Sequence, residues 1–200
     1  ISVSYPRLID DKEVLLSKLS SGFIRGPINP ELIALYKADD LRLKLFIGTD
    51  VNTYKGSVYI KPLFNNPNYY YSYIGLNSPE IILNRAEVYA RQNNVAKVVE
   101  LLNLLRKKRF AASKYIALSQ TEISGNLLQS VIDERRREFI GTDLRWYDMR
   151  RLTLDGNYFK TVSRTLNGQT YTLTASSPRL IYPINQEVLT LNPEIGQNPR

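Results

Sequence analysis

The most regular alternation of apolar and polar positions lies in the middle of the chain and predicts two helices. Between residues 78 and 92, apolar side chains recur at the helical spacings of three and four, at Ile81, Ile82, Leu83, Ala86, Tyr89 and Ala90. Ser78 and Pro79 suit the N-cap and the first helical position. After a break at Asn93 and Asn94, a more apolar run covers residues 95–105. So short a break predicts an antiparallel helical hairpin.

This hairpin resembles one tetratricopeptide repeat unit, with Ala86 and Ala96 at positions that would allow close approach of the two helices. A single repeat cannot bury its own apolar face, so it is stable only when other structure covers that face. We therefore expect either stacking neighbours or another layer of structure to cover the hairpin.

Further helices are predicted on both sides of the hairpin. One opens at Thr121 and runs to residue 140, with Gly125 weakening its first turns. A shorter one follows Asp143 and carries Trp146, which we expect to be buried. Near the front of the chain, short helices are predicted over residues 14–19, after Asp10 or Asp11, and from Asn29 to residue 35.

Strand patterns are short and few. Residues 57–60 predict a strand, residues 41–47 fit either a strand or the end of a helix, and residues 171–174 and 180–182 could pair. Residues 61–77 and 155–169 are rich in turn formers. The expected fold is one mainly α domain over residues 1–200: a tetratricopeptide-like helical hairpin packed with additional helices, long irregular loops and a few short β-strands.

Composition excludes several kinds of chemistry. The chain has no Cys and no His, so disulfides, zinc sites built on thiolate or imidazole, and triads with a His base are excluded. No cofactor and no metal are expected. The longest apolar runs, such as residues 98–105, are interrupted by polar residues and are too short to span a bilayer. Because the chain opens with Ile1 and shows no leader pattern, we expect it to begin inside a longer or processed protein.

The formal net charge of +8, from 27 Lys and Arg against 19 Asp and Glu, raises the possibility of nucleic-acid binding. The basic residues 106–109 end a helical pattern, however, where the helix dipole favours cations. Residues 135–137, all Arg, lie between Glu134 and Glu138, which offer local ion-pair partners. A basic nucleic-acid binder therefore stays an alternative, and no nucleic-acid partner is expected.

Tyrosine is unusually frequent, at 14 of 200 residues, and clusters at Tyr69, Tyr70, Tyr71 and Tyr73 beside Asn68. A tyrosine offers a flat apolar ring and a hydroxyl group, which suits the apolar faces of sugars, with amide side chains at the edge. These five residues are the candidate ligand-binding site. The alternative is that the tyrosines pack their loop onto the helical hairpin.

A second candidate group combines acids and arginines with aromatic residues: Glu134, Arg135, Glu138, Arg145, Trp146, Asp148 and Arg151. Their helical spacing favours a structural network of ion pairs and hydrogen bonds. As a glycosidase pair, Glu134 and Glu138 would lie one helical turn apart, but Arg neighbours would keep both ionised, leaving no acid. We therefore expect no catalytic residues and no enzyme activity.

Three groups of residues, in this order of weight, form a further pattern: 134–139 with 145–151, then 182–185 with 192–193 and 197–199, and then 40–42 with 85–87. Together, from about residue 30 to the end, they resemble the C-terminal part of the SusD/RagB family, the surface nutrient-binding lipoproteins of certain Gram-negative bacteria.

The resemblance implies a non-catalytic protein that captures oligosaccharide and delivers it to a TonB-dependent, SusC-like outer-membrane transporter. It implies a location at the cell surface, on the outer membrane, through an N-terminal lipid anchor that this chain, without Cys, does not carry. Peptide binding of the RagB type and a helical-repeat scaffold that binds only protein stay open as alternatives.

Overall fold

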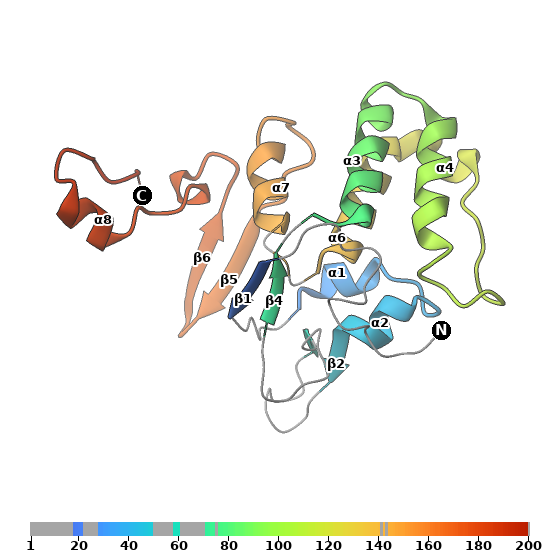
Figure 1. The fold of residues 1–200 in the computed structure, drawn as a ribbon, viewed down its shortest axis with the longest axis horizontal. Helices are drawn as coiled ribbons and strands as arrows, with labels where there is room; N and C mark the ends of the chain where they lie inside the picture. The colour runs from blue at the N-terminus through green and yellow to red at the C-terminus, as the bar shows by residue number, and fades with distance from the viewer. Residues whose placement is uncertain are drawn as a thin grey trace. The chain divides into compact units, whose positions relative to one another are not determined.

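The computed structural model describes residues 18–21, 28–49, 58–60, 71–74, 76–140, 142 and 144–199 (Figure 1). The chain divides into two compact units, Ile1–Thr142 and Asp143–Arg200, and each is described by itself. The expectation of one domain over residues 1–200 stays a prediction. Among the described residues, no helix has the length and apolar character needed to cross a bilayer.

The predicted helical hairpin is formed by α3 (Ser78–Arg91) and α4 (Val95–Arg106), which lie side by side in Figure 1. The N-cap of α3 is Asn77 rather than Ser78, because the Asn77 side chain accepts a hydrogen bond from the Glu80 amide at 2.8 Å. At the turn, Asn93 takes the left-handed conformation with φ 56°. Asn94 then caps α4 by accepting from the Lys97 amide at 3.1 Å.

The helix predicted from Thr121 to residue 140 is interrupted. A short helix α5 (Gln120–Ile123) is followed by the 3₁₀ turn η2 (Ser124–Asn126), which contains Gly125, and then by α6 (Leu127–Glu138). Helix α5 begins one residue before the predicted Thr121, and Ser119 caps it through a capping box with Glu122. The break has a local cause. Ser119 favours a helix start through its capping box, and Gly125 weakens a helix only a few residues later.

Helix α6 supplies the layer that the hairpin needs. It packs against both α3 and α4, and the three helices share a core of buried apolar side chains: Leu83, Ala86, Ala90, Val98, Leu101, Leu102, Leu105, Leu127, Val131 and Ile132. Ala86 is fully buried as expected, whereas Ala96 is exposed. The fold is mainly helical, as predicted, and contains the predicted helical hairpin.

The first unit also contains short helices and two small antiparallel sheets. Helices α1 (Pro30–Ala34) and α2 (Leu41–Phe46) precede strand β2 (Ile47–Thr49), so residues 41–47 are mostly helix. Strand β2 pairs with β3 (Val58–Ile60), and β1 (Lys18–Ser21) pairs with β4 (Tyr71–Ile74). The helix predicted to reach Leu19 is wrong at that residue, which lies in β1; residues 10–17 lie outside the described residues.

The second unit begins with the predicted short helix, α7 (Leu144–Leu152), in which Trp146 is half-buried rather than buried. Strand β6 (Gln169–Leu173) pairs with β5 (Val162–Leu166), which lies in a stretch expected to be loop. Asn167 and Gly168, both with positive φ, form the hairpin turn. The predicted pairing with residues 180–182 is wrong, since Leu180 ends the 3₁₀ turn η3 (Pro178–Leu180), which precedes α8 (Gln186–Leu191).

Candidate functional site

Only part of the predicted ligand-binding site falls within the described residues. Asn68, Tyr69 and Tyr70 lie outside the described residues. Tyr71 and Tyr73 lie on strand β4, where only the backbone is described; Tyr73 is in register with Leu19 and Tyr71 with Ser21 on β1. The tyrosine site stays a prediction.

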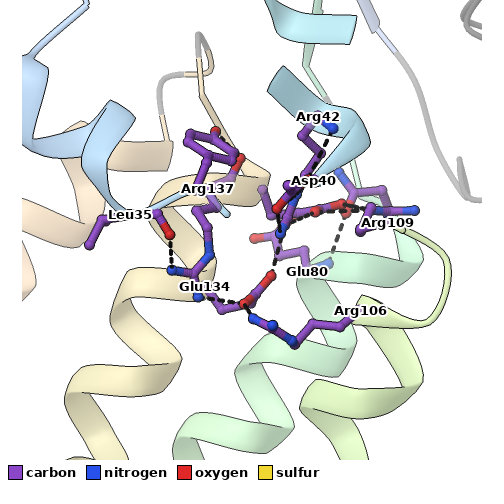
Figure 2. Close-up of polar contacts among 11 residues, drawn as sticks. Leu35, Asp40, Arg42, Glu80, Arg106, Arg109, Glu134 and Arg137 are labelled. Atoms are coloured by element: carbon purple, nitrogen blue, oxygen red, sulfur yellow. Dashed lines mark hydrogen bonds and ion pairs between the residues drawn. The ribbon is translucent and has the colours of Figure 1, made fainter. Parts of the chain in front are cut away.

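Two residues of the second candidate group, Glu134 and Glu138, belong to a buried cluster of charged side chains (Figure 2). We call this cluster the arginine–carboxylate network. It joins three segments that are far apart in the sequence: the start of α2, the end of α4 and the end of α6. Its members are Asp40, Arg42, Arg106, Arg109, Glu134, Arg137 and Glu138.

Arg42 lies at the centre of the network and is fully buried. Its Nε and Nη2 donate to the Asp40 carboxylate at 2.9 and 2.7 Å, and its Nη1 donates to Glu138 Oε2 at 2.8 Å. Asp40 also accepts from the Arg42 backbone amide at 3.0 Å, so it caps the first turn of α2. The guanidinium group is thus held by a local carboxylate and by one 96 residues away.

Glu134 is also fully buried, and it pairs with three arginines of the network. Oε2 accepts from Arg106 Nη1 at 3.2 Å and from Arg137 Nη2 at 2.5 Å. Oε1 lies 2.8 Å from Arg42 Nη1, which makes an ion pair without the angles of a hydrogen bond. One carboxylate on α6 therefore contacts α2 and α4 as well as its own helix.

Glu138, one turn along α6, completes the network with Arg109. Arg109 Nε lies 3.0 Å from both carboxylate oxygens. The backbone also joins these segments: the Leu41 amide donates to the Arg109 carbonyl at 2.9 Å, next to a β-bridge between Asp40 and Phe110. The end of α4 is thereby attached to the start of α2 by charges and by main chain.

The loop between α1 and α2 is attached to α6 in a similar way. Arg137 Nη1 donates to the Leu35 carbonyl at 3.0 Å, and the Tyr36 hydroxyl donates to the Arg137 carbonyl at 2.7 Å. The Arg42 guanidinium carbon lies 5.7 Å from the centre of the Tyr36 ring, within the range of a cation–π contact. Burial raises the pKa of the Tyr36 hydroxyl, so it stays protonated and able to donate.

The network keeps its carboxylates ionised. Burial alone would raise the pKa of Glu134, but Arg42, Arg137 and Arg106 outweigh it and lower that pKa to about 2. For Glu138, burial is likewise outweighed, by Arg109 and Arg42, and the pKa is lowered. The pKa of Arg42 is raised, because Glu134 and Asp40 outweigh the effect of burial. General acid catalysis needs a carboxyl group that stays protonated, and neither glutamate can supply one near neutral pH.

The contacts described for other residues of the second candidate group involve different partners. Arg135 donates to Asn84 Oδ1 on α3 at 2.6 Å and lies over the Phe139 ring. In the second unit, Arg151 donates to Asp148 at 2.9 Å, and Trp146 stacks on Tyr182. Arg145 lies on the same helix, α7. The structure thus brings Glu134 and Glu138 together in the network.

Several network residues carried little signal in the sequence. The sequence pattern assigned Arg106 and Arg109 to the end of a helix, where the dipole favours cations; in the structure Arg106 is buried and both point toward α6 carboxylates. Their separations of 28 and 29 residues from these partners correspond to no local period. Across the described residues, no group of three or more acidic side chains could hold a metal ion.

Comparison with known proteins identifies a family and similar solved structures. The family model described as the SusD family matches residues 79–200, from the first turn of α3 to the end of the chain. A crystal structure of a SusD-like carbohydrate binding protein from Bacteroides vulgatus is similar at 23% identity, with a TM-score of 0.46. The match covers 74% of this chain and 32% of that one, so this chain spans about a third of that protein's length. No curated protein matches the chain.

Proposed function

Because the chain belongs to the SusD family, we propose that it is part of a surface protein that binds glycan and passes it on without chemical change. The observation that carries the proposal is the family match over residues 79–200, which includes the helical hairpin, α6 with its two network glutamates, and the C-terminal segment. The resemblance seen in the sequence adds the expected ligand class, oligosaccharide.

The two glutamates of the network are unsuited to glycoside hydrolysis. A glycosidase needs one carboxylic acid and one carboxylate placed across a sugar. Glu134 and Glu138 are held ionised by arginines and buried beneath them, with side-chain exposures of 0% and 6%. A sugar could reach neither carboxylate without breaking the network.

The remaining parts of the proposal come from the family resemblance. We propose that the parent protein delivers its ligand to a TonB-dependent, SusC-like transporter in the outer membrane, and that a lipid anchor holds it at the cell surface. Peptide binding of the RagB type is the second candidate ligand class. The tyrosines at 69, 70, 71 and 73 with Asn68 are the proposed contact residues.

Equilibrium binding to defined ligands tests the proposal. The chain would be measured by calorimetry and affinity electrophoresis against soluble α-glucan, β-glucan, mannan, xylan and pectin, with unstructured peptides of mixed sequence as the comparison. We expect saturable binding to at least one glycan and no release of reducing ends on long incubation. Binding to peptides alone would favour the RagB type, and glycan cleavage would contradict the proposed absence of catalysis.

A further inference from the structure

The second unit carries a stacked pair of aromatic rings that the network does not involve. Trp146 on α7 and Tyr182, between η3 and α8, lie with ring centroids 5.0 Å apart and planes inclined by 21°. Trp146 is half-buried, whereas Tyr182 is 53% exposed. One face of the Tyr182 ring therefore contacts the indole, while about half of the residue is accessible to solvent.

The backbone that carries Tyr182 is held in place by the C-terminal segment. Asn198 Nδ2 donates to the Tyr182 carbonyl at 2.7 Å. Two residues further on, Ile184 exchanges hydrogen bonds with the Gln197 side chain, through its amide at 2.9 Å and its carbonyl at 3.0 Å. On the other side, the Ile181 amide donates to the Pro178 carbonyl at 3.1 Å. An aromatic ring fixed in this way loses little conformational entropy when a ligand lies on it.

This combination has the properties of a sugar-stacking surface. A pyranose ring offers an apolar face of C–H groups, which contacts the flat face of an aromatic ring. The indole of Trp146 packs against one face of the Tyr182 ring. The side-chain amides of Gln197 and Asn198 donate to backbone carbonyls of the segment that carries Tyr182. Tyr171 on β6 is similarly exposed, at 47%, but no ring is described against it, and its hydroxyl donates to Gln169.

We propose that Trp146 and Tyr182 form an aromatic platform that binds one pyranose ring of a glycan. The proposal rests on the glycan binding proposed above and adds contact residues in the second unit. Tyr182 touches the sugar, and Trp146 positions Tyr182 and supports it.

Trp146 gives the proposal a direct readout, because it is the single tryptophan of the whole chain. Oligosaccharides of four to seven units, prepared from whichever polysaccharide binds in the panel, would be titrated while tryptophan emission and calorimetric heat are recorded in parallel. We expect a saturable change in emission with the same midpoint as the calorimetric curve, and weaker quenching by acrylamide in the complex.

Variants separate the ring from its surroundings. Tyr182→Leu keeps an apolar group over Trp146 but removes the ring, and we expect an affinity loss of about fivefold or more. Tyr182→Phe keeps the ring and should bind nearly as the parent chain does. Tyr171→Ala is the matched control and should leave the affinity unchanged. Circular dichroism of each variant establishes that the helices are retained.

The outcomes distinguish this proposal from the one on which it rests. If a glycan binds while Trp146 emission stays constant and folded Tyr182→Leu binds normally, the platform is disproved and glycan binding stands. An equal loss in Tyr171→Ala would also disprove the platform, because the effect would not depend on the stack. If the folded chain binds no glycan in the panel, both proposals fail.

Discussion

Glu134 is the residue on which most contacts of the arginine–carboxylate network depend, since it pairs with Arg42, Arg106 and Arg137 while fully buried. Glu134→Gln keeps the shape of the side chain but removes its charge, and leaves buried guanidinium groups short of a counter-ion. We expect the free energy of unfolding to fall by about 3 to 5 kcal/mol, measured by urea denaturation followed by circular dichroism.

Glu100→Gln is the matched control for this substitution. Glu100 also accepts from a cation, Lys97 Nζ at 2.8 Å, but both side chains are exposed on α4. Exposed pairs of this kind contribute little to stability, so the midpoint of unfolding should hardly move. If both variants lost a similar free energy of unfolding, burial would not explain how much the network stabilises the fold.

The lowered pKa of Glu134 gives the network a pH dependence with a definite sign. In the unfolded chain the pKa of a glutamate is about 4.3, and in the folded protein that of Glu134 is about 2. Its stabilising contribution is therefore complete above the unfolded value and is lost as the pH falls toward 2. Urea midpoints at pH 7, 4, 3 and 2 should converge for the parent chain and Glu134→Gln. A gap that stays constant across this range would contradict the assignment.

At the predicted tyrosine site, the double substitution Tyr70→Ala and Tyr71→Ala tests whether these rings contact glycan. We expect weaker glycan binding with retained helix content, since an aromatic ring contributes most of its contact energy through its face. Calorimetry with the glycan that binds the parent chain gives the measurement. Unchanged affinity in the folded double variant would remove these two tyrosines from the site, leaving the packing role for their loop.

What the sequence could predict at single residues depended on how far away their partners lie. The arginines next to Glu134 and Glu138 in the chain were visible as local partners, and Arg137 does pair with Glu134. Arg42, 96 residues before Glu138, entered only through the family resemblance. The buried role of Arg106 was missed, because a cation at a helix end fits the helix dipole equally well.

The turn between α3 and α4 shows how single asparagines define an element. Asn94→Ala removes the side-chain oxygen that accepts from the Lys97 amide, so the first turn of α4 loses its cap. We expect a loss of about 1 kcal/mol in the free energy of unfolding. Asn93→Gly is the control, since φ 56° suits glycine, and it should leave stability unchanged or raise it. Equal losses in both would contradict the capping role of Asn94.

Among the elements, those with a strong apolar period were predictable and those set by neighbours were not. The helices α3 and α4 match their predicted ranges to within a few residues, because each has both a periodic apolar face and a clear break. Strand β5 was missed: four of its five residues are exposed, so it shows no alternation of buried and exposed positions. Its register is given by its turn and by cross-strand hydroxyl pairs such as Ser163 with Thr172.

For the whole molecule, the excess of positive charge is less available than the composition suggests. Of the 27 Lys and Arg residues, several arginines are already paired with carboxylates: Arg42, Arg91, Arg106, Arg109, Arg136, Arg137 and Arg151. Nucleic-acid binding instead needs cations that exchange their counter-ions for phosphates. Lys107 and Lys108, which follow α4, are exposed cations of that kind.

The salt dependence of binding therefore separates the two classes of ligand. We expect glycan affinity to be the same at about 50 and about 200 mM salt. Any DNA affinity should fall steeply over that interval, because DNA binding depends on counter-ion release. Charge reversal at Lys107→Glu and Lys108→Glu should abolish the DNA binding and leave the glycan isotherm unchanged, since stacking on an aromatic ring involves no exchange of ions. Tight, salt-dependent DNA binding together with no glycan binding would make the chain a basic nucleic-acid binder, in spite of its family.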